Sequence, residues 1–212
     1  MKLKSNSFTD GMMLPSELAF AVIDENDPEA HIALGRNRNP HLAWSDVPIG
    51  TRSFVVICHD PDVPSSGEDV NKEGREVPVS LPRLDFYHWL LLDVGVTVRE
   101  IEAGSHSEKV TARGKSGPAA RGKLRHGIND YTQWFASDEK MSGAYYGYDG
   151  PCPPWNDALL HRYVFTVYAL DIEMLNVKGS LDGGNIRAAM AGHVLAQASL
   201  TGRYTLNPRL RD

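Results

Sequence analysis

The segment that most constrains the fold is the run YVFTVYALD at residues 163–171, which is apolar on both faces of an extended chain. Side chains alternate between the two faces of a β-strand. One face would carry Tyr163, Phe165, Val167 and Ala169, and the other would carry Val164, Thr166, Tyr168 and Leu170. A strand that is apolar on both faces must be covered on both sides. The run therefore predicts the central strand of a sheet.

Four further segments carry strand patterns, at residues 18–24, 54–60, 86–94 and 199–204. Pro61 follows the second of them and should end it, because proline cannot donate a ladder hydrogen bond. One Ala-rich segment, residues 186–196, predicts a helix. Several strands with a single late helix predict a mostly-β fold.

Long connections separate these elements. Residues 62–83 should form an exposed loop, and residues 104–143 are polar and rich in glycine. Loops of such length are usually functional or carry short elements of their own. We find no linker composition between the segments, so the sequence predicts one domain over residues 1–212, with its core at about 18–204.

Composition restricts the class of protein. The 212 residues are 42% hydrophobic and carry a net charge of −5, which argues against a nucleic-acid surface because such a surface needs a basic face. No run approaches the roughly 18 apolar residues of a membrane span, and the first residues contain no signal-peptide core. The sequence predicts a cytoplasmic protein with Cys58 and Cys152 reduced. A bridge between them is the less favoured alternative.

One basic stretch lies between residues 113 and 126. Its basic residues, interleaved with glycines, are Arg113, Lys115, Arg121, Lys123, Arg125 and His126. Two interpretations stay open, a phosphate-binding loop and a solvated, flexible loop, and the glycine content favours the second.

Polar side chains that could form a site lie at the boundaries of three predicted strands. Asp60 ends one strand, and Pro64 helps to stiffen the backbone that follows it. His88 lies inside another strand, where a buried imidazole needs hydrogen-bond partners. His161 and Tyr163 are two residues apart and so share one face of the central strand. Taken singly, each has a structural alternative, as a turn residue or a satisfied core side chain.

Taken together, the same residues predict an anion site. A carboxylate near two histidines raises their pKa, because it favours the charged ring. We expect Asp60 to hold and charge His88 or His161. The imidazoles and the Tyr163 hydroxyl would then donate hydrogen bonds to a small anion such as phosphate. The prolines of residues 150–154 would fix one wall of the pocket in advance, so that little ordering entropy is lost on binding.

Three motifs, in order along the chain, resemble those of a known family. They are DPDVP at residues 60–64, YHW at 87–89, and GPCPP at 150–154 followed by HRYVF at 161–165. Together they resemble the phosphatidylethanolamine-binding proteins, also called Raf kinase inhibitor proteins, and most closely the bacterial branch. The similarity extends over roughly residues 18–204, and it depends on the order of the motifs, each with a strand behind it.

The resemblance implies a single β-sandwich-like Greek-key domain with a few short helices, and a pocket for phosphate-bearing head groups. The residues that it implies as pocket lining are Asp60, Pro64, His88, Gly150, Pro151, His161 and Tyr163. It also implies that the C-terminal helix, here around 185–195, lies near the pocket mouth. Tyr87 departs from the family pattern, because many bacterial members have Trp there. The segments 65–85 and 104–143 are unusually long and would reshape the entrance.

The favoured function is a non-catalytic protein that binds a small anion, either a phosphate-bearing small molecule or a phospholipid head group. No cofactor and no metal are predicted, because the chain lacks H-E-x-x-H and paired C-x-x-C motifs. The alternative is a hydrolase that uses the His/Asp pocket and Cys152, although no G-x-S-x-G motif is present. A regulatory, kinase-inhibitor-like role with a kinase partner, and a homodimer, are implied by the resemblance alone.

Overall fold

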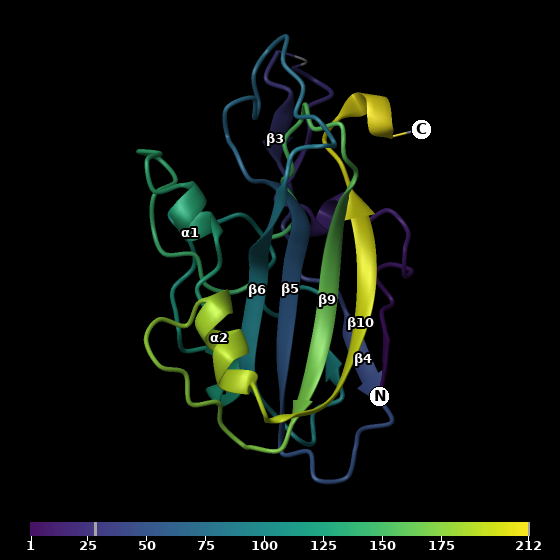
Figure 1. The fold of residues 1–212 in the computed structure, drawn as a ribbon, viewed down its shortest axis with the longest axis vertical. Coiled ribbons are helices and arrows are strands. Elements are labelled where there is room, and N and C mark those ends of the chain that lie inside the picture. The colour runs from purple at the N-terminus through teal and green to yellow at the C-terminus, as the bar shows by residue number, and fades with distance from the viewer. Residues whose placement is uncertain (28, 212) are drawn as a thin grey trace.

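One five-stranded antiparallel sheet organises the molecule, and its long strands run along the long axis (Figure 1). The computed structural model describes residues 1–27 and 29–211; residues 28 and 212 of the predicted domain lie outside them. In sheet order, the strands are β10 (Val194–Tyr204), β9 (His161–Leu170), β5 (Ser53–Pro64), β6 (Arg83–Gly95) and β8 (Arg125–His126). The predicted mostly-β fold is confirmed.

Shorter elements surround this sheet. The remaining strands are β1 (Lys2–Lys4), β4 (Leu42–Ser45) and β7 (Glu100–Ile101) in one sheet, and β2 (Ala21–Ile23) and β3 (Ile32–Leu34) in another. The helices are α1 (Tyr131–Trp134) and α2 (Gly183–Met190), with 3₁₀ turns at Ser16–Leu18, Arg121–Lys123 and Pro208–Leu210. No helix within residues 1–27 and 29–211 is long and apolar enough to cross a membrane.

The three-stranded sheet packs against one face of the large sheet. Trp44 of β4 meets Phe54 of β5 edge-on, with 5.2 Å between the ring centroids, and both rings belong to the main hydrophobic cluster. This two-layer packing agrees with the predicted sandwich, and the Greek-key connectivity stays a prediction.

β9 is the central strand that its sequence predicts. It pairs with β5 on one side and with β10 on the other, and its side chains enter two separate hydrophobic clusters. Phe165 and Val167 belong to the larger cluster, and their side of the sheet is called the inner face below. Tyr168 and Leu170 belong to the smaller cluster on the outer face. α2 covers the outer face (Figure 1).

β5 continues past the point where Pro61 was predicted to end it. Its ladder with β9 stops at the pair His59–Val164, whereas its ladder with β6 shifts register beyond Asp60 and runs on to Pro64. Prolines are tolerated at sheet edges and bulges because no ladder hydrogen bond is lost there. The prediction that the strand ends at Pro61 was therefore wrong, and Asp60 lies on a bulged strand.

The predicted helix at 186–196 is helical only in its first half. α2 ends at Met190, Gly192 adopts a left-handed φ of 84°, and the chain then enters β10 at Val194. Pairing with β9 overrides the helical preference of this Ala-rich segment. The resemblance implied that this helix lies near the pocket mouth, and that expectation was wrong. Ile186 and Met190 of α2 pack on the outer face, whereas the cavity is on the inner face.

One further predicted segment differs from the structure and one agrees with it. The first predicted strand, 18–24, is reduced to β2, preceded by a 3₁₀ turn. The long connection 104–143 carries short elements of its own, as expected for its length, namely β8 and α1. A helix of one turn gives too short a periodic pattern to be recognised in a polar sequence.

Candidate functional site

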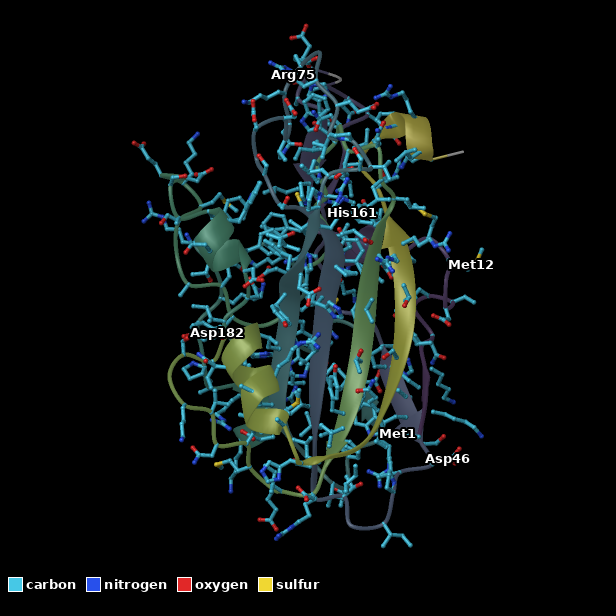
Figure 2. All side chains as sticks on the ribbon, viewed as in Figure 1. Met1, Met12, Asp46, Arg75, His161 and Asp182 are labelled. Atoms are coloured by element: carbon cyan, nitrogen blue, oxygen red, sulfur yellow. The ribbon has the colours of Figure 1, made fainter. Side chains whose placement is uncertain are left out.

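A cavity of about 350 Å³ lies at one end of the large sheet, on its inner face. Figure 2 shows His161 at this end, far from Met1. Most of its walls are apolar, with contributions from Phe20, Leu34 and Phe135. The four polar side chains that reach it from β5, β6 and β9, named the polar floor below, are Asp60, His88, His161 and Tyr163. All four are almost completely buried, so the structure brings together the residues that the sequence singled out.

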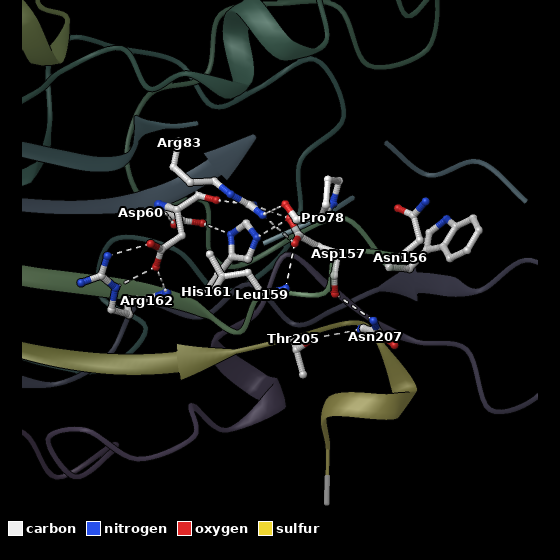
Figure 3. A network of polar contacts seen from close by, with 12 residues as sticks. Asp60, Pro78, Arg83, Asn156, Asp157, Leu159, His161, Arg162, Thr205 and Asn207 are labelled. Atoms are coloured by element: carbon white, nitrogen blue, oxygen red, sulfur yellow. Dashed lines mark hydrogen bonds and ion pairs between the residues drawn. The ribbon is translucent and has the colours of Figure 1, made fainter. Parts of the chain in front are cut away.

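Two residues of the polar floor, Asp60 and His161, belong to a chain of charged side chains (Figure 3). His161 Nδ1 lies 2.7 Å from Asp60 Oδ2, and His161 Nε2 lies 3.0 Å from Asp157 Oδ2. Arg83 donates to both oxygens of Asp157, at 2.6 and 3.1 Å. Because each imidazole nitrogen faces a carboxylate, each carries a proton. Two negative and two positive charges therefore balance within the network.

This geometry decides the protonation of His161. Burial would lower the pKa of His161, but hydrogen bonds to Asp157 and Asp60 raise it to about 9. Burial likewise opposes the charge of Asp157, yet hydrogen bonds from His161 and Arg83 hold the pKa of that carboxyl below its usual range. Of the two histidines considered, Asp60 thus holds His161. Both N–H groups of His161 are donated within the protein, and neither points to a ligand.

His88 reaches the polar floor through a β-bulge. Trp89 pairs with Cys58 and Tyr87 pairs with His59, so His88 is the extra residue in the β5–β6 ladder. An extra residue interrupts the alternation of faces. Trp89 therefore packs in the main cluster of the inner face, next to a histidine that also points there.

The His88 ring is neutral. Its Nδ1 donates to the backbone carbonyl of Asp149 at 2.8 Å, and burial lowers the pKa of His88 to about 4 although Asp60 opposes this shift. Within the described part of the chain, His88 Nε2 is buried and has no hydrogen-bond partner. The prediction that a nearby carboxylate charges both histidines was therefore wrong for His88, because burial outweighs the attraction of Asp60.

Tyr163 completes the polar floor. Its ring centroid lies 5.1 Å from that of His88, in an edge-on arrangement. Its hydroxyl is buried and lacks a hydrogen-bond partner among the described residues. Burial and the Asp60 carboxylate raise the pKa of Tyr163 well above its ordinary value, so the hydroxyl keeps its proton and remains a donor. Two buried polar atoms without partners, His88 Nε2 and Tyr163 Oη, thus belong to neighbouring rings that line one cavity.

Gly150 and Pro151 support the pocket from behind, whereas residues 152–154 and Pro64 line it directly. The Gly150 amide donates to Asn37 Oδ1, and its carbonyl accepts from the Tyr131 hydroxyl, both at 2.7 Å. The Pro151 carbonyl accepts from the amides of Phe20 and Ala21. Residues 152–154 thus form a wall of the cavity. The prediction that Gly150 and Pro151 also line it was wrong, because their backbone groups bond to residues one layer behind the cavity surface.

Sequence reasoning missed several residues of the site. Asp157 holds His161 and is itself held by Arg83. Neither lies in a strand predicted from the sequence, and only the presence of an acid four residues before His161 could have drawn attention to Asp157. Tyr131 and Trp134 of α1, with Phe135 directly after it, form another wall. Their aromatic spacing in a polar segment is the one signal that could have indicated this wall.

The insertion 65–85 forms part of the pocket. Gly67, Val70 and Asn71 line the cavity. Asn156 fixes this loop: its Nδ2 donates to the carbonyls of Asp69, Lys72 and Arg75, and its Oδ1 accepts from the Asn71 amide at 2.9 Å. The expectation that this segment reshapes the entrance is consistent with its position.

The basic stretch is divided between structure and solvent. Lys115 Nζ lies 2.6 Å from Asp149 Oδ1, a fully buried carboxylate, and Arg125 pairs with Asp93 at 2.5 Å. Arg121 and Lys123 are exposed. The Lys115–Asp149 pair lies next to His88 in the structure, because the backbone carbonyl of Asp149 accepts a hydrogen bond from His88 Nδ1. The preference for a purely solvated loop was therefore wrong for part of this stretch.

Cys58 and Cys152 are free thiols, and burial raises the pKa of Cys152 to about 12, so the thiolate that acts as a nucleophile is not formed at neutral pH. In the described ranges, no group of three or more His, Cys, Asp or Glu side chains is placed to hold a metal ion.

The buried histidines predict how stability depends on pH. The pKa values of His88, His106 and His126 are lowered by burial to about 4, from an ordinary value of 6.5. Between pH 6.5 and 4 the unfolded chain binds more protons, so stability falls with falling pH. His161, with its pKa of about 9, stabilises fully below pH 6.5 and loses this contribution as pH rises through 9.

We therefore expect the free energy of unfolding to be greatest near pH 6.5, with each histidine contributing up to about 1.4 kcal/mol per pH unit inside its window. Urea denaturation at several pH values between 4 and 10 measures this profile. A free energy of unfolding that stays constant from pH 6.5 to 10 would contradict the assignment of His161 as an imidazolium.

The fold and the site define a class of mostly-β proteins: a large antiparallel sheet carries, at one end, a cavity with apolar walls and a buried polar floor. The family model described as phosphatidylethanolamine-binding protein matches residues 4–205. The chain belongs to this family. It is 31% identical over 205 residues to the UPF0098 protein YbhB of Escherichia coli (strain K12), covering 97% of this chain and 100% of the relative.

Solved structures agree with this assignment. The chain is similar to E. coli YbcL, described as a new member of the mammalian PEBP family, with a TM-score of 0.65 and 25% identity over 96% of this chain and 97% of that one. It is also similar to a putative phosphatidylethanolamine-binding protein homologue from Chlamydia trachomatis, with a TM-score of 0.60 and 26% identity over 96% and 95% of the two chains.

Proposed function

We propose that this protein binds a small ligand with a phosphate-bearing head group and does not convert it chemically. The observation that carries the proposal is the pair of orphaned buried atoms, His88 Nε2 and Tyr163 Oη, which lack partners within the described residues. Buried polar groups are hydrogen-bonded in the great majority of proteins. A polar head group that reaches both atoms would therefore supply the hydrogen bonds that these two buried atoms lack.

The walls of the cavity support a ligand with apolar parts. Phe20, Phe86 and Phe135 surround the polar floor, so the chain offers hydrogen bonds at one end of the cavity and apolar contact along the rest. A phospholipid head group and a phosphate-bearing small molecule share the chemistry that this arrangement recognises.

The chemistry of the side chains favours binding over turnover. Both nitrogens of His161 are engaged by carboxylates, so this ring is not free to act as a general base. The Cys152 thiol, the nucleophile of the hydrolase alternative, has a pKa raised by burial to about 12. Turnover of p-nitrophenyl phosphate that disappears in Cys152→Ala would establish the hydrolase instead.

Titration calorimetry with phosphoethanolamine at pH 6 tests the proposal. Removing the donor in Tyr163→Phe should weaken binding by roughly 10- to 100-fold, the magnitude of a hydrogen bond to a charged group. Tyr168→Phe is the matched control, because Tyr168 belongs to the cluster of the outer face, and it should bind like the wild type. Absence of binding of both phosphoethanolamine and inorganic phosphate from pH 5 to 8 would refute the proposal.

The cytoplasmic location, the kinase partner and the homodimer stay predictions. The free thiols of Cys58 and Cys152 are compatible with a reducing compartment. A regulatory, kinase-inhibitor-like role rests on the family resemblance, and it would be supported by a protein partner whose capture phosphoethanolamine weakens.

A further inference from the structure

The hydrogen bond behind His88 fixes which of its nitrogens carries the proton. Nδ1 lies 2.8 Å from the Asp149 carbonyl oxygen, and a carbonyl oxygen can only accept. Nδ1 therefore carries a proton in every protonation state of the ring. A neutral imidazole has one N–H, so Nε2, the nitrogen without a partner in the described structure, presents a lone pair. The nitrogen that the ligand would meet is thus an acceptor.

The rest of the polar floor is also short of donors. Asp60 accepts from His161 through Oδ2 and from the Asp62 amide through Oδ1, and a carboxylate has no proton to donate. The N–H groups of His161 are both in use. Tyr163 is thus the single floor residue, among those described, with a donor left for a ligand. The oxygens of a fully ionised phosphate can only accept hydrogen bonds. The ligand-free polar floor therefore offers such a phosphate one donor, the Tyr163 hydroxyl, and opposes the His88 Nε2 lone pair to a phosphate oxygen.

We propose that a phosphate ligand enters this pocket together with one proton, which lies between His88 Nε2 and a phosphate oxygen. This inference rests on the proposed function, and it implies that the affinity for the ligand depends on pH. The proton comes from solvent or arrives on the phosphate; no other bond forms or breaks. In the complex, His88 donates to Asp149 on one side and shares the added proton with the ligand on the other.

The groups around His88 explain why the ring takes up a proton only when phosphate is bound. The titratable side chains that contact its ring or line the same cavity are Asp60, Tyr131, Cys152, His161 and Tyr163. Asp149 contacts the ring through its backbone carbonyl, whereas its carboxylate is bound to Asn37, Lys115 and Asn129. Asp60 favours a charged ring, whereas burial and the cationic His161 oppose it, and burial dominates in the free protein. A phosphate negative charge at hydrogen-bond distance adds a second favourable term, because an opposite charge stabilises the protonated imidazole.

The source of the proton depends on the ligand, and this gives a sharp test. A phosphodiester such as glycerophosphoethanolamine has no phosphate proton near neutral pH, so it must draw one from solvent. A monoester such as phosphoethanolamine has a second pKa of about 6 and brings its own proton below that pH. Both probes carry the same ammonium group, so differences between them report the phosphate.

Titration calorimetry in three phosphate-free buffers of different ionisation enthalpy gives the number of protons taken up. We expect about one proton per diester bound at pH 7, and an affinity for the diester that falls roughly tenfold per pH unit between pH 6 and 8. For the monoester we expect about one proton at pH 8 and close to none at pH 5. Diester binding at pH 7 without proton uptake would overturn the inference while leaving the proposed function intact. Failure of both probes to bind would overturn both.

A substitution identifies the proton acceptor. His88→Gln places an amide that donates without ionising, so diester binding should persist with little proton uptake and a flat pH dependence. His126→Gln is the matched control, because His126 is another buried histidine with a pKa near 4 and does not line the cavity. It should retain the uptake of the wild type. Unchanged uptake in a folded His88→Gln protein would assign the proton elsewhere and overturn the inference.

Discussion

Replacing Asp157 with asparagine should lower the free energy of unfolding by about 3–5 kcal/mol, because it breaks a buried ion-pair network by removing one partner. Asp157 is 1% exposed and accepts from His161 at 3.0 Å and from Arg83 at 2.6 Å. The asparagine amide presents a donor where the second carboxylate oxygen stood and carries no negative charge, so at least one hydrogen bond from His161 or Arg83 is lost. Urea denaturation at pH 7 measures the change.

The matched control for this substitution is Glu173→Gln. Glu173 pairs with Arg52 at 2.7 Å, but its side chain is 74% exposed, and exposed pairs contribute less than about 1 kcal/mol. Equal effects of the two substitutions would contradict the view that the network of Asp157 is buried and cooperative. Loss of the alkaline part of the pH profile in Asp157→Asn alone would support it, because the pKa of His161 then falls.

Replacing Gly150 with alanine should destabilise the protein by about 2–3 kcal/mol, the upper range for overpacking. A Cβ atom at Gly150 would lie 2.0 Å from the Leu18 carbonyl oxygen and 2.8 Å from the Tyr148 hydroxyl. The first contact is with backbone, so the segment 150–154 must move away from residues 18–20. Because this segment forms one wall of the cavity, phosphoethanolamine binding should weaken roughly tenfold, equivalent to ~1.4 kcal/mol. Urea denaturation and calorimetry measure the two effects.

Gly67→Ala separates a steric effect at the wall from a general effect of losing glycine. Gly67 also lines the cavity, yet among the described residues no atom lies within 4 Å of a Cβ built there. Its stability and ligand affinity should stay close to those of the wild type. If both glycine variants bind equally well, the stiff wall at residues 150–154 does not shape the pocket.

Much of the fold could be predicted because it depends on local patterns. The two-faced apolar run of β9 predicted its central position, and the ends of β5 and β9 predicted which polar residues would meet. The resemblance of the three motifs to one family predicted the same place for the pocket, and the family is confirmed. The boundaries of β5 and α2 were predicted less well, because pairing with a neighbouring strand decided them.

The sequence by itself determined the existence of the long strands β5, β6 and β9, the family and the residue types at one end of the sheet. The tertiary structure alone decided how those residues are used. A bulge at His88 turns that ring inward, and the two nitrogens of His161 are engaged by Asp60, which lies 101 residues away in the chain, and by Asp157, four residues before it. The physical reason is that strand register and the hydrogen-bond partners of a buried ring depend on residues far apart in the chain, whereas side-chain alternation depends on neighbours.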